Sequence, residues 1–156
     1  MKTPLLRLIT TTIVLLTFGC ASRTHFDTRT VTTAPEGKAL VTLYRPGSFA
    51  GAASAFKIFA NDRHITSLPN ASYYPYIAEP GVVRFAKKMQ VNPLNVGLAS
   101  LLDPKQDLIE LKVEPGRAYY VRFKLGIGKT TMERVDDTIA HKELSTLSQA
   151  TPANAD

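Results

Sequence analysis

The residue best suited to covalent chemistry is Cys20, the only cysteine among the 156 residues. It ends a short apolar run, residues 8–16, and the run itself follows a basic start with Lys2 and Arg7. Gly19, directly before the thiol, is the small residue that signal cleavage favours. This layout is typical of an export signal at residues 1–19. It predicts that the Cys20 sulfur carries a diacylglyceryl group and that the new amino terminus is acylated, for example by palmitate.

The predicted signal is too short to remain as a membrane-spanning helix, which needs about 20 apolar residues. Each buried methylene contributes ~0.8 kcal/mol, so several acyl chains on Cys20 would form a stable anchor. An ordinary secretory signal is the alternative, because Thr17 and Phe18 stand where leucine and a small residue are preferred. Ala21 after the cysteine, in place of Asp, favours the bacterial outer membrane, with the domain facing the periplasm.

The remaining composition excludes several classes of function. Removal of Lys2 and Arg7 lowers the formal net charge from +6 to +4, and the basic residues are scattered. No basic cluster interleaved with aromatics occurs, so we expect no nucleic-acid partner. Acylation of Cys20 would leave no thiol for a disulfide, a nucleophile or a metal site. Hydrophobic residues at 44% and charged residues at 21% indicate a folded domain.

The other side chains with catalytic potential do not form a recognisable constellation. His25, His64 and His141 lack the spacing of metal ligands, and no nucleophile is paired with a base. The sequence therefore predicts no enzymatic activity, no metal and no cofactor. An enzyme whose site these motifs do not reveal is the alternative.

Tyrosine and arginine are the side chains most suited to binding, because they combine a large contact area with a polar end. The candidate binding surface consists of Tyr73, Tyr74, Tyr76, Tyr120, Arg84 and Arg122, with Tyr119, Arg45 and Arg117 nearby in sequence. Its expected partner is an envelope protein or peptidoglycan. Tyrosines in strands are also common cross-strand packing residues, so a structural role is the alternative.

The polar segment at residues 20–37 is expected to be a flexible tether, and the small polar tail at residues 149–156 is expected to be disordered. Between them, strand patterns dominate the chain. The expected strands cover residues 38–45, 56–59, 64–68, 73–78, 82–85, 108–113, 117–123 and 130–135. Asn61-Asp62-Arg63 suits a hairpin loop, and Pro75 restricts its strand to an edge or a bulge. Residues 38–148 are therefore predicted to form an antiparallel β-sandwich with a short C-terminal helix.

Two Glu-Pro-Gly turns and a helix complete this prediction. Residues 79–81 and 114–116 suit type II turns and are expected to join antiparallel neighbours. In the strand after the second turn, residues 119, 121 and 123 alternate with 120, 122 and 124, which predicts one buried and one solvent-exposed face. Asp136 or Asp137 is expected to cap a helix. Its buried stripe comprises Ala140, Leu144 and Leu147.

An apolar segment at residues 92–104, with Leu94, Leu98 and Leu101, has two interpretations. It is a short helix or a lid over one end of the sandwich, or it is a surface that contacts a partner or lipid. As a contact surface it would dock the protein as a structural subunit into an envelope complex. The sequence leaves the oligomeric state open.

Four segments follow one another in a distinctive order. They are Ala39-Leu40-Val41-Thr42-Leu43-Tyr44-Arg45-Pro46-Gly47, Asn70-Ala71-Ser72-Tyr73, Glu79-Pro80-Gly81 and Val113-Glu114-Pro115-Gly116-Arg117-Ala118-Tyr119-Tyr120-Val121. This order resembles the bacterial lipoproteins grouped as domain of unknown function 2846, over about residues 36–147. The resemblance implies an exported β-rich domain and a closing helix around Ala140 and Glu143-Leu144. It implies no reaction or ligand.

Overall fold

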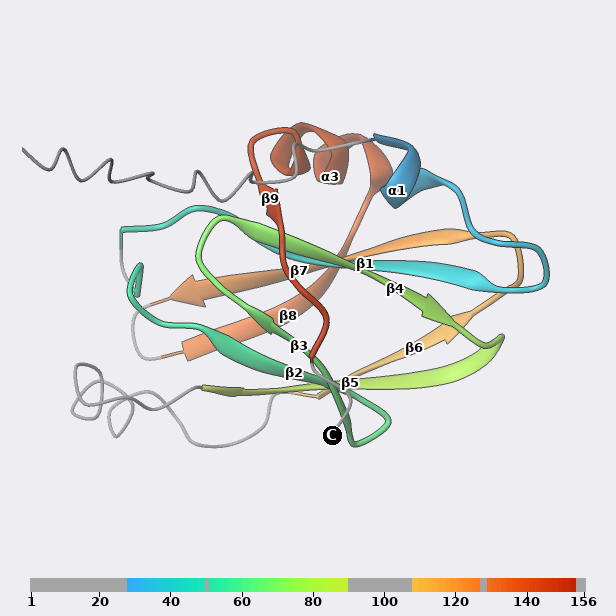
Figure 1. The fold of residues 1–156 in the computed structure, drawn as a ribbon, viewed down its shortest axis with the longest axis horizontal. Coiled ribbons are helices and arrows are strands. Elements are labelled where there is room, and N and C mark those ends of the chain that lie inside the picture. The colour runs from blue at the N-terminus through green and yellow to red at the C-terminus, as the bar shows by residue number, and fades with distance from the viewer. Residues whose placement is uncertain (1–27, 50, 90–107, 127–128, 154–156) are drawn as a thin grey trace, which may run out of the picture.

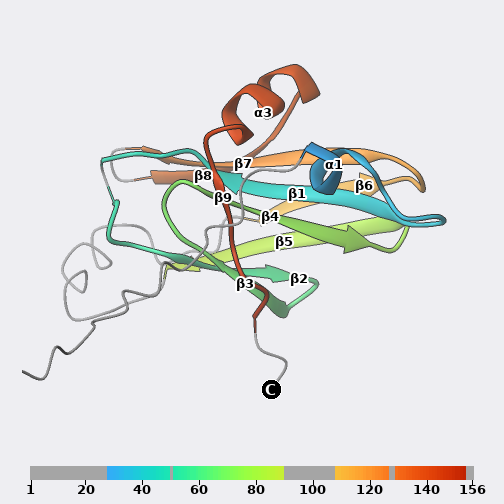
Figure 2. The ribbon, with the colours of Figure 1, turned by 45° about the horizontal axis from the view of Figure 1, so that its top comes forward.

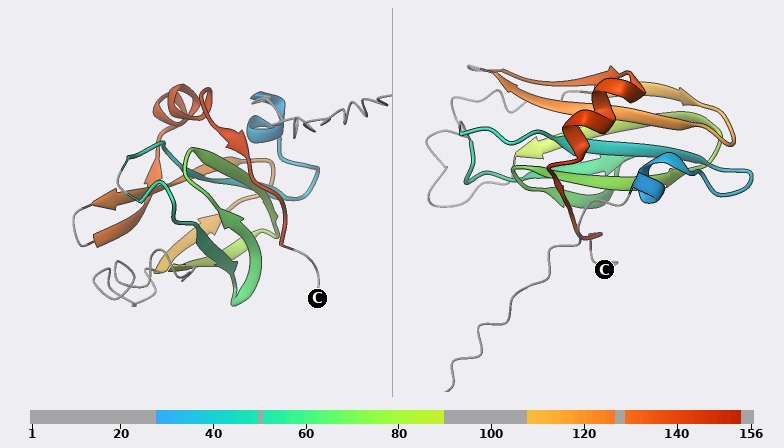
Figure 3. Two further views of the ribbon diagram at one scale, coloured as in Figure 1. Left: turned by 60° about the vertical axis from the view of Figure 1, so that its left-hand side comes forward. Right: turned by 90° about the horizontal axis from the view of Figure 1, so that it is seen from above.

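The structure, a computed structural model, describes residues 28–49, 51–89, 108–126 and 129–153. Within these residues two β-sheets pack face to face (Figures 1 and 3). The five-stranded sheet has the order β8-β7-β1-β4-β9. Its strands are β1 (Ala39–Arg45), β4 (Ser72–Ala78), β7 (Ala118–Gly126), β8 (Lys129–Val135) and β9 (Ser148–Gln149). The four-stranded sheet has the order β3-β2-β5-β6, with β2 (Phe56–Ala60), β3 (Arg63–Leu68), β5 (Gly81–Met89) and β6 (Leu108–Val113).

The main core lies between the sheets and follows the period-two alternation of the strands. Val41 and Leu43 from β1 meet Ile58 from β2 and Phe85 from β5, and all four side chains are fully buried. The prediction of a mainly β sandwich with a C-terminal helix is confirmed. Most neighbouring strands are antiparallel, but β1 pairs with β7, and β4 with β9, in parallel.

Both Glu-Pro-Gly turns connect the two sheets, so the prediction that they join antiparallel neighbours is wrong. Residues 79–81 lead from β4 into β5, and residues 114–116 lead from β6 into β7. Gly81 and Gly116 adopt the expected positive φ, at 131° and 73°. The chemistry of the turn was therefore predictable, whereas the sheet that the chain enters depends on packing far from the turn.

The hairpin between β2 and β3 is confirmed, with a loop shortened to Asn61 and Asp62. Their φ values of 46° and 66° suit a type I′ turn, which matches the twist of the flanking strands. Pro75 lies in β4, but only Ser72 and Tyr73 of that strand pair with β9. The missing N–H of Pro75 therefore removes no hydrogen bond between these two strands.

The outer face of the five-stranded sheet is covered by α1 (Thr28–Thr32) and α3 (Asp137–Leu144), as Figure 2 shows. Ala140, Leu144 and Leu147 are buried against Tyr120 and other residues of this face, which confirms the predicted stripe. The expectation that this face is exposed to solvent is wrong for Tyr120, which is buried beside α3, and holds for Lys124 near the end of β7, which is exposed. Asp136 occupies the N-cap position without a side-chain capping hydrogen bond, so the predicted capping contact is also absent.

Both ends of the described chain are packed against the sandwich. The predicted tether is wrong from residue 28 onward, because Val31 of α1 is fully buried and its carbonyl accepts a 2.9 Å hydrogen bond from Tyr120. The predicted disordered tail is wrong for residues 149–153. Ala150 donates to the Tyr73 carbonyl at 2.7 Å, and Ala153 donates to the Ile65 carbonyl at 2.8 Å. The C-terminal segment therefore connects the two sheets along one edge.

Candidate functional site

A cavity of about 260 Å³ lies where β1 ends beside β7, and we call it the β1-end cavity. The pairing of β1 with β7 ends at Tyr44 and Arg122, although β7 continues to Gly126. Pro46 follows β1 and has no N–H to continue the ladder. The cavity is lined by Arg45, Pro46, Gly47, Ser48, Arg122, Phe123, Lys124, Leu125 and Glu143. A shorter strand next to a longer one therefore leaves this space.

Arg45 is the most unusual residue of the lining, because its side chain is only 2% exposed. Nη1 donates to the Ser54 carbonyl at 2.6 Å, and Nη2 donates to the Gly51 carbonyl at 2.7 Å. The guanidinium carbon lies 4.9 Å from the centroid of the Phe56 ring. Nε is buried without a hydrogen-bond partner, and no described carboxylate forms an ion pair with Arg45. Burial lowers the pKa of this guanidinium from its ordinary value.

A second buried cation lies near the same aromatic ring. The Lys87 ammonium lies 5.5 Å from the Phe56 ring centroid, and Lys87 is 8% exposed. Arg45 and Lys87 thus come from opposite sheets and meet one ring at the same end of the interior.

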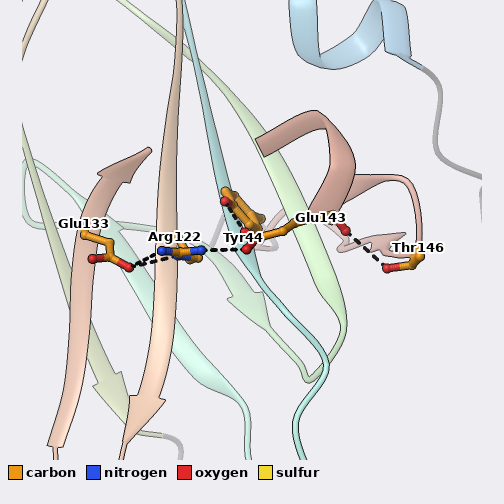
Figure 4. A network of polar contacts seen from close by, with 5 residues as sticks. All are labelled: Tyr44, Arg122, Glu133, Glu143 and Thr146. Atoms are coloured by element: carbon orange, nitrogen blue, oxygen red, sulfur yellow. Dashed lines mark hydrogen bonds and ion pairs between the residues drawn. The ribbon is translucent and has the colours of Figure 1, made fainter. Parts of the chain in front are cut away.

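An ion-pair network forms the wall of the cavity nearest α3 (Figure 4). Arg122 contacts Glu143 at 2.6 Å and Glu133 at 2.7 Å. Tyr44 donates a 2.6 Å hydrogen bond to the second oxygen of Glu143. Burial opposes the charge on Arg122, but its two carboxylate partners outweigh that effect and raise its pKa. Burial, followed by the hydrogen bond to Glu143, raises the pKa of Tyr44 well above its usual range.

The six residues of the candidate binding surface do not form one surface, so that prediction is wrong. Tyr73 and Tyr120 are buried beneath α3, whereas Tyr74 and Tyr76 pack against the core between the sheets. Arg84 is exposed on the other sheet and pairs with Glu110 at 2.8 Å. Arg122 lies in the network below α3. Alternation along β4 sends Tyr73 to the face opposite Tyr74 and Tyr76, in keeping with the cross-strand packing alternative.

The remaining predicted sites lie outside the described residues. These are Cys20 and the docking residues Leu94, Leu98 and Leu101. To the residues predicted from sequence, the structure adds Lys124, Leu125 and an interior position for Arg45. Arg45 continues the inward alternation of Val41 and Leu43, so its direction could have been inferred from period two.

A second cavity, of about 400 Å³, lies beside α1. It is lined by Thr32, Gly116, Arg117, Ala118, Tyr119, Tyr120, Arg134, Asp137 and His141. The Tyr120 hydroxyl and His141 Nε2 are 2.8 Å apart, and the Arg134 guanidinium lies 5.0 Å from the Tyr119 ring centroid. Burial, with a smaller contribution from Asp137, raises the pKa of Tyr120 to about 12. The hydroxyl therefore stays protonated at neutral pH and acts as a structural donor.

Across the described ranges, no group of three His, Cys, Asp or Glu residues could hold a metal ion. In the same part of the chain, no helix is long and apolar enough to cross a membrane. Comparison with protein-family models, with curated proteins and with solved structures gave no match. Functional inference therefore depends on the residues and geometry described above.

Proposed function

We propose that this protein is a bacterial envelope lipoprotein that acts as a non-enzymatic binding module or adaptor. Acyl chains on Cys20 hold it to the outer membrane, and the domain faces the periplasm. The observation that carries the binding role is the buried guanidinium of Arg45, whose Nε has no protein acceptor beside the β1-end cavity. The export-signal layout around Cys20 supports the anchor. Membership in the family named domain of unknown function 2846 is part of the same proposal.

The packing of α1 limits how far such an anchor could hold the domain from the bilayer. Eight residue steps separate Cys20 from Thr28, where α1 begins. At 3.3–3.6 Å per residue they span at most about 29 Å. The anchor would therefore confine binding to partners close to the membrane, such as envelope proteins or peptidoglycan.

Site-specific photocrosslinking in intact cells tests the binding role. A photoreactive amino acid replaces Lys124 at the β1-end cavity, and a matched variant carries it at Lys112, which is exposed on β6 of the other sheet. We expect one recurrent crosslinked partner from position 124 and none from position 112. A Cys20→Ser variant should lose both membrane retention and that partner.

Two results would contradict this proposal. The absence of any crosslink from position 124 would remove the cavity as a binding site. A recurrent partner captured only by probes within residues 92–104 would favour the alternative, in which the protein is a structural subunit that docks through that segment.

A further inference from the structure

Arg45 lacks the anionic partner that a buried guanidinium ordinarily has. A guanidinium offers five N–H donors. Two of its nitrogens bond to the carbonyls of Gly51 and Ser54, which carry no net charge, and Nε is unpaired. Holding an ion out of water without a counterion is energetically unfavourable. An anion that enters the β1-end cavity would offset part of this cost.

The other charged residues of the lining leave an excess of positive charge. The lining holds Arg45, Arg122 and Lys124 with one carboxylate, that of Glu143, and Arg122 also pairs with Glu133 outside the lining. Counting both carboxylates still leaves one positive charge in excess. Glu143 is already occupied, because its two oxygens accept hydrogen bonds from Tyr44 and Arg122. Lys124 is exposed at the rim and lies on the same face of β7 as Arg122. Its flexible ammonium is therefore placed to meet an incoming anion.

The backbone beside this charge suits an extended peptide. Residues 123–125 of β7 lie beyond the last pair with β1, and they line the cavity together with Pro46. A strand edge of this kind can accept main-chain hydrogen bonds from an added peptide strand. Leu125, which is only partly buried, supplies an apolar contact at the same place.

Gly51 shows how closely the neighbouring loop borders the cavity. A Cβ at this position would lie 2.4 Å from Leu125 Cδ2 and 3.4 Å from Arg45 Nη2, and the residue has a φ of 74°. A side chain here would clash with Leu125 and would be strained by the positive φ, so the glycine lets the loop lie close to the cavity. The carbonyls of Gly51 and Ser54 in this loop accept the hydrogen bonds that hold the Arg45 guanidinium in place.

We infer that the β1-end cavity binds the C-terminal carboxylate of an extended peptide, with Lys124 contacting the carboxylate, Arg45 supplying the interior positive potential and residues 123–125 of β7 pairing with the peptide backbone. This inference deepens the proposed binding function and rests on it for its biological setting. The site itself does not require acylation of Cys20.

Calorimetric titration of the protein extracted in non-ionic detergent tests this assignment. The probes are acetylated trialanine with a free C-terminal carboxylate, the same peptide with a C-terminal amide, and inorganic phosphate. We expect the free acid to bind at least about tenfold more tightly than the amide, because the amide removes the charge. Equal binding of acid and amide, or binding of phosphate alone, would overturn the inference.

Three variants locate the binding site on the protein. Lys124→Gln should weaken binding of the free acid, whereas Lys112→Gln, on the other sheet, should leave it unchanged. Arg45→Met replaces a buried charge with an apolar side chain of similar length and should abolish the preference for acid over amide. Retention of that preference by a folded Arg45→Met protein contradicts the role given to Arg45.

The same titration on Cys20→Ser separates this inference from the anchor. Unchanged peptide binding by an unlipidated variant supports the site independently of the membrane. Loss of binding in a folded Cys20→Ser protein contradicts the statement that the site does not require acylation.

Discussion

Tyr44 donates a 2.6 Å hydrogen bond to Glu143, although the two residues are 99 positions apart in the chain. This bond connects β1 to α3, and the other oxygen of Glu143 connects the helix to Arg122 of β7. One carboxylate thus holds the C-terminal helix on the sheet and completes a wall of the β1-end cavity. The stability of the helix and the shape of the cavity depend on the same contact.

Glu143→Gln should destabilise the protein by about 2 kcal/mol, because it weakens two charge-assisted contacts in a partly buried site. Urea unfolding measures this change. Glu110→Gln is the matched control, since its partner Arg84 is exposed and such pairs contribute about 1 kcal/mol or less. Equal losses in the two variants would contradict the role given to Glu143.

Val31→Ala should lower the free energy of unfolding by about 2 kcal/mol, because the side chain is fully buried and its loss leaves a cavity under α1. Val82→Ala makes the same chemical change at a side chain that is 57% exposed, and we expect an effect within about 0.5 kcal/mol. Thermal or urea unfolding compares them. A silent Val31→Ala would show that α1 is dispensable to the fold.

Truncation after Leu147 should destabilise the domain and promote self-association. It removes the hydrogen bonds of Ala150 and Ala153 to the two sheets and uncovers the edge of β4. Light scattering coupled to size exclusion reports the association. Truncation after Ala153 is the control, because it keeps these contacts. Monomeric, equally stable products from both truncations would show that the segment is not needed at this edge.

Stability should fall as the pH rises from about 10 towards 12, in part through Tyr120. The pKa of Tyr120 is raised to about 12, so over this interval the unfolded chain releases a phenolic proton that the folded chain retains. The contribution is fully present below pH 10. In Tyr120→Phe the loss should be smaller by up to about 1.4 kcal/mol per pH unit. Urea unfolding at pH 9, 10 and 11 checks this, and identical slopes would contradict it.

Much of the fold follows from local patterns. Tyr119, Val121 and Phe123 lie in the core between the sheets, and Ala140 and Leu144 form the predicted buried stripe. The path of the chain after Gly81 and Gly116 could not be predicted in this way, because a turn specifies a change of direction and not the sheet that the next strand joins. The burial of Tyr120 likewise depends on a helix that lies later in the chain.

The candidate site was less predictable than the fold. The inward direction of Arg45 follows from its spacing after Val41 and Leu43. The cavity beside it depends on where β1 ends relative to β7. These two parallel strands pair residues that are far apart in the chain, such as Tyr44 and Arg122, which are 78 positions apart. No local pattern carries that information.

The most direct test of membrane anchoring is the intact mass of the protein extracted from the envelope, measured beside a Cys20→Ser control. We expect a chain that starts at Cys20 and carries the added mass of a diacylglyceryl group and an amide-linked acyl chain, both absent from the control. A mature chain without acyl mass would contradict the lipid anchor.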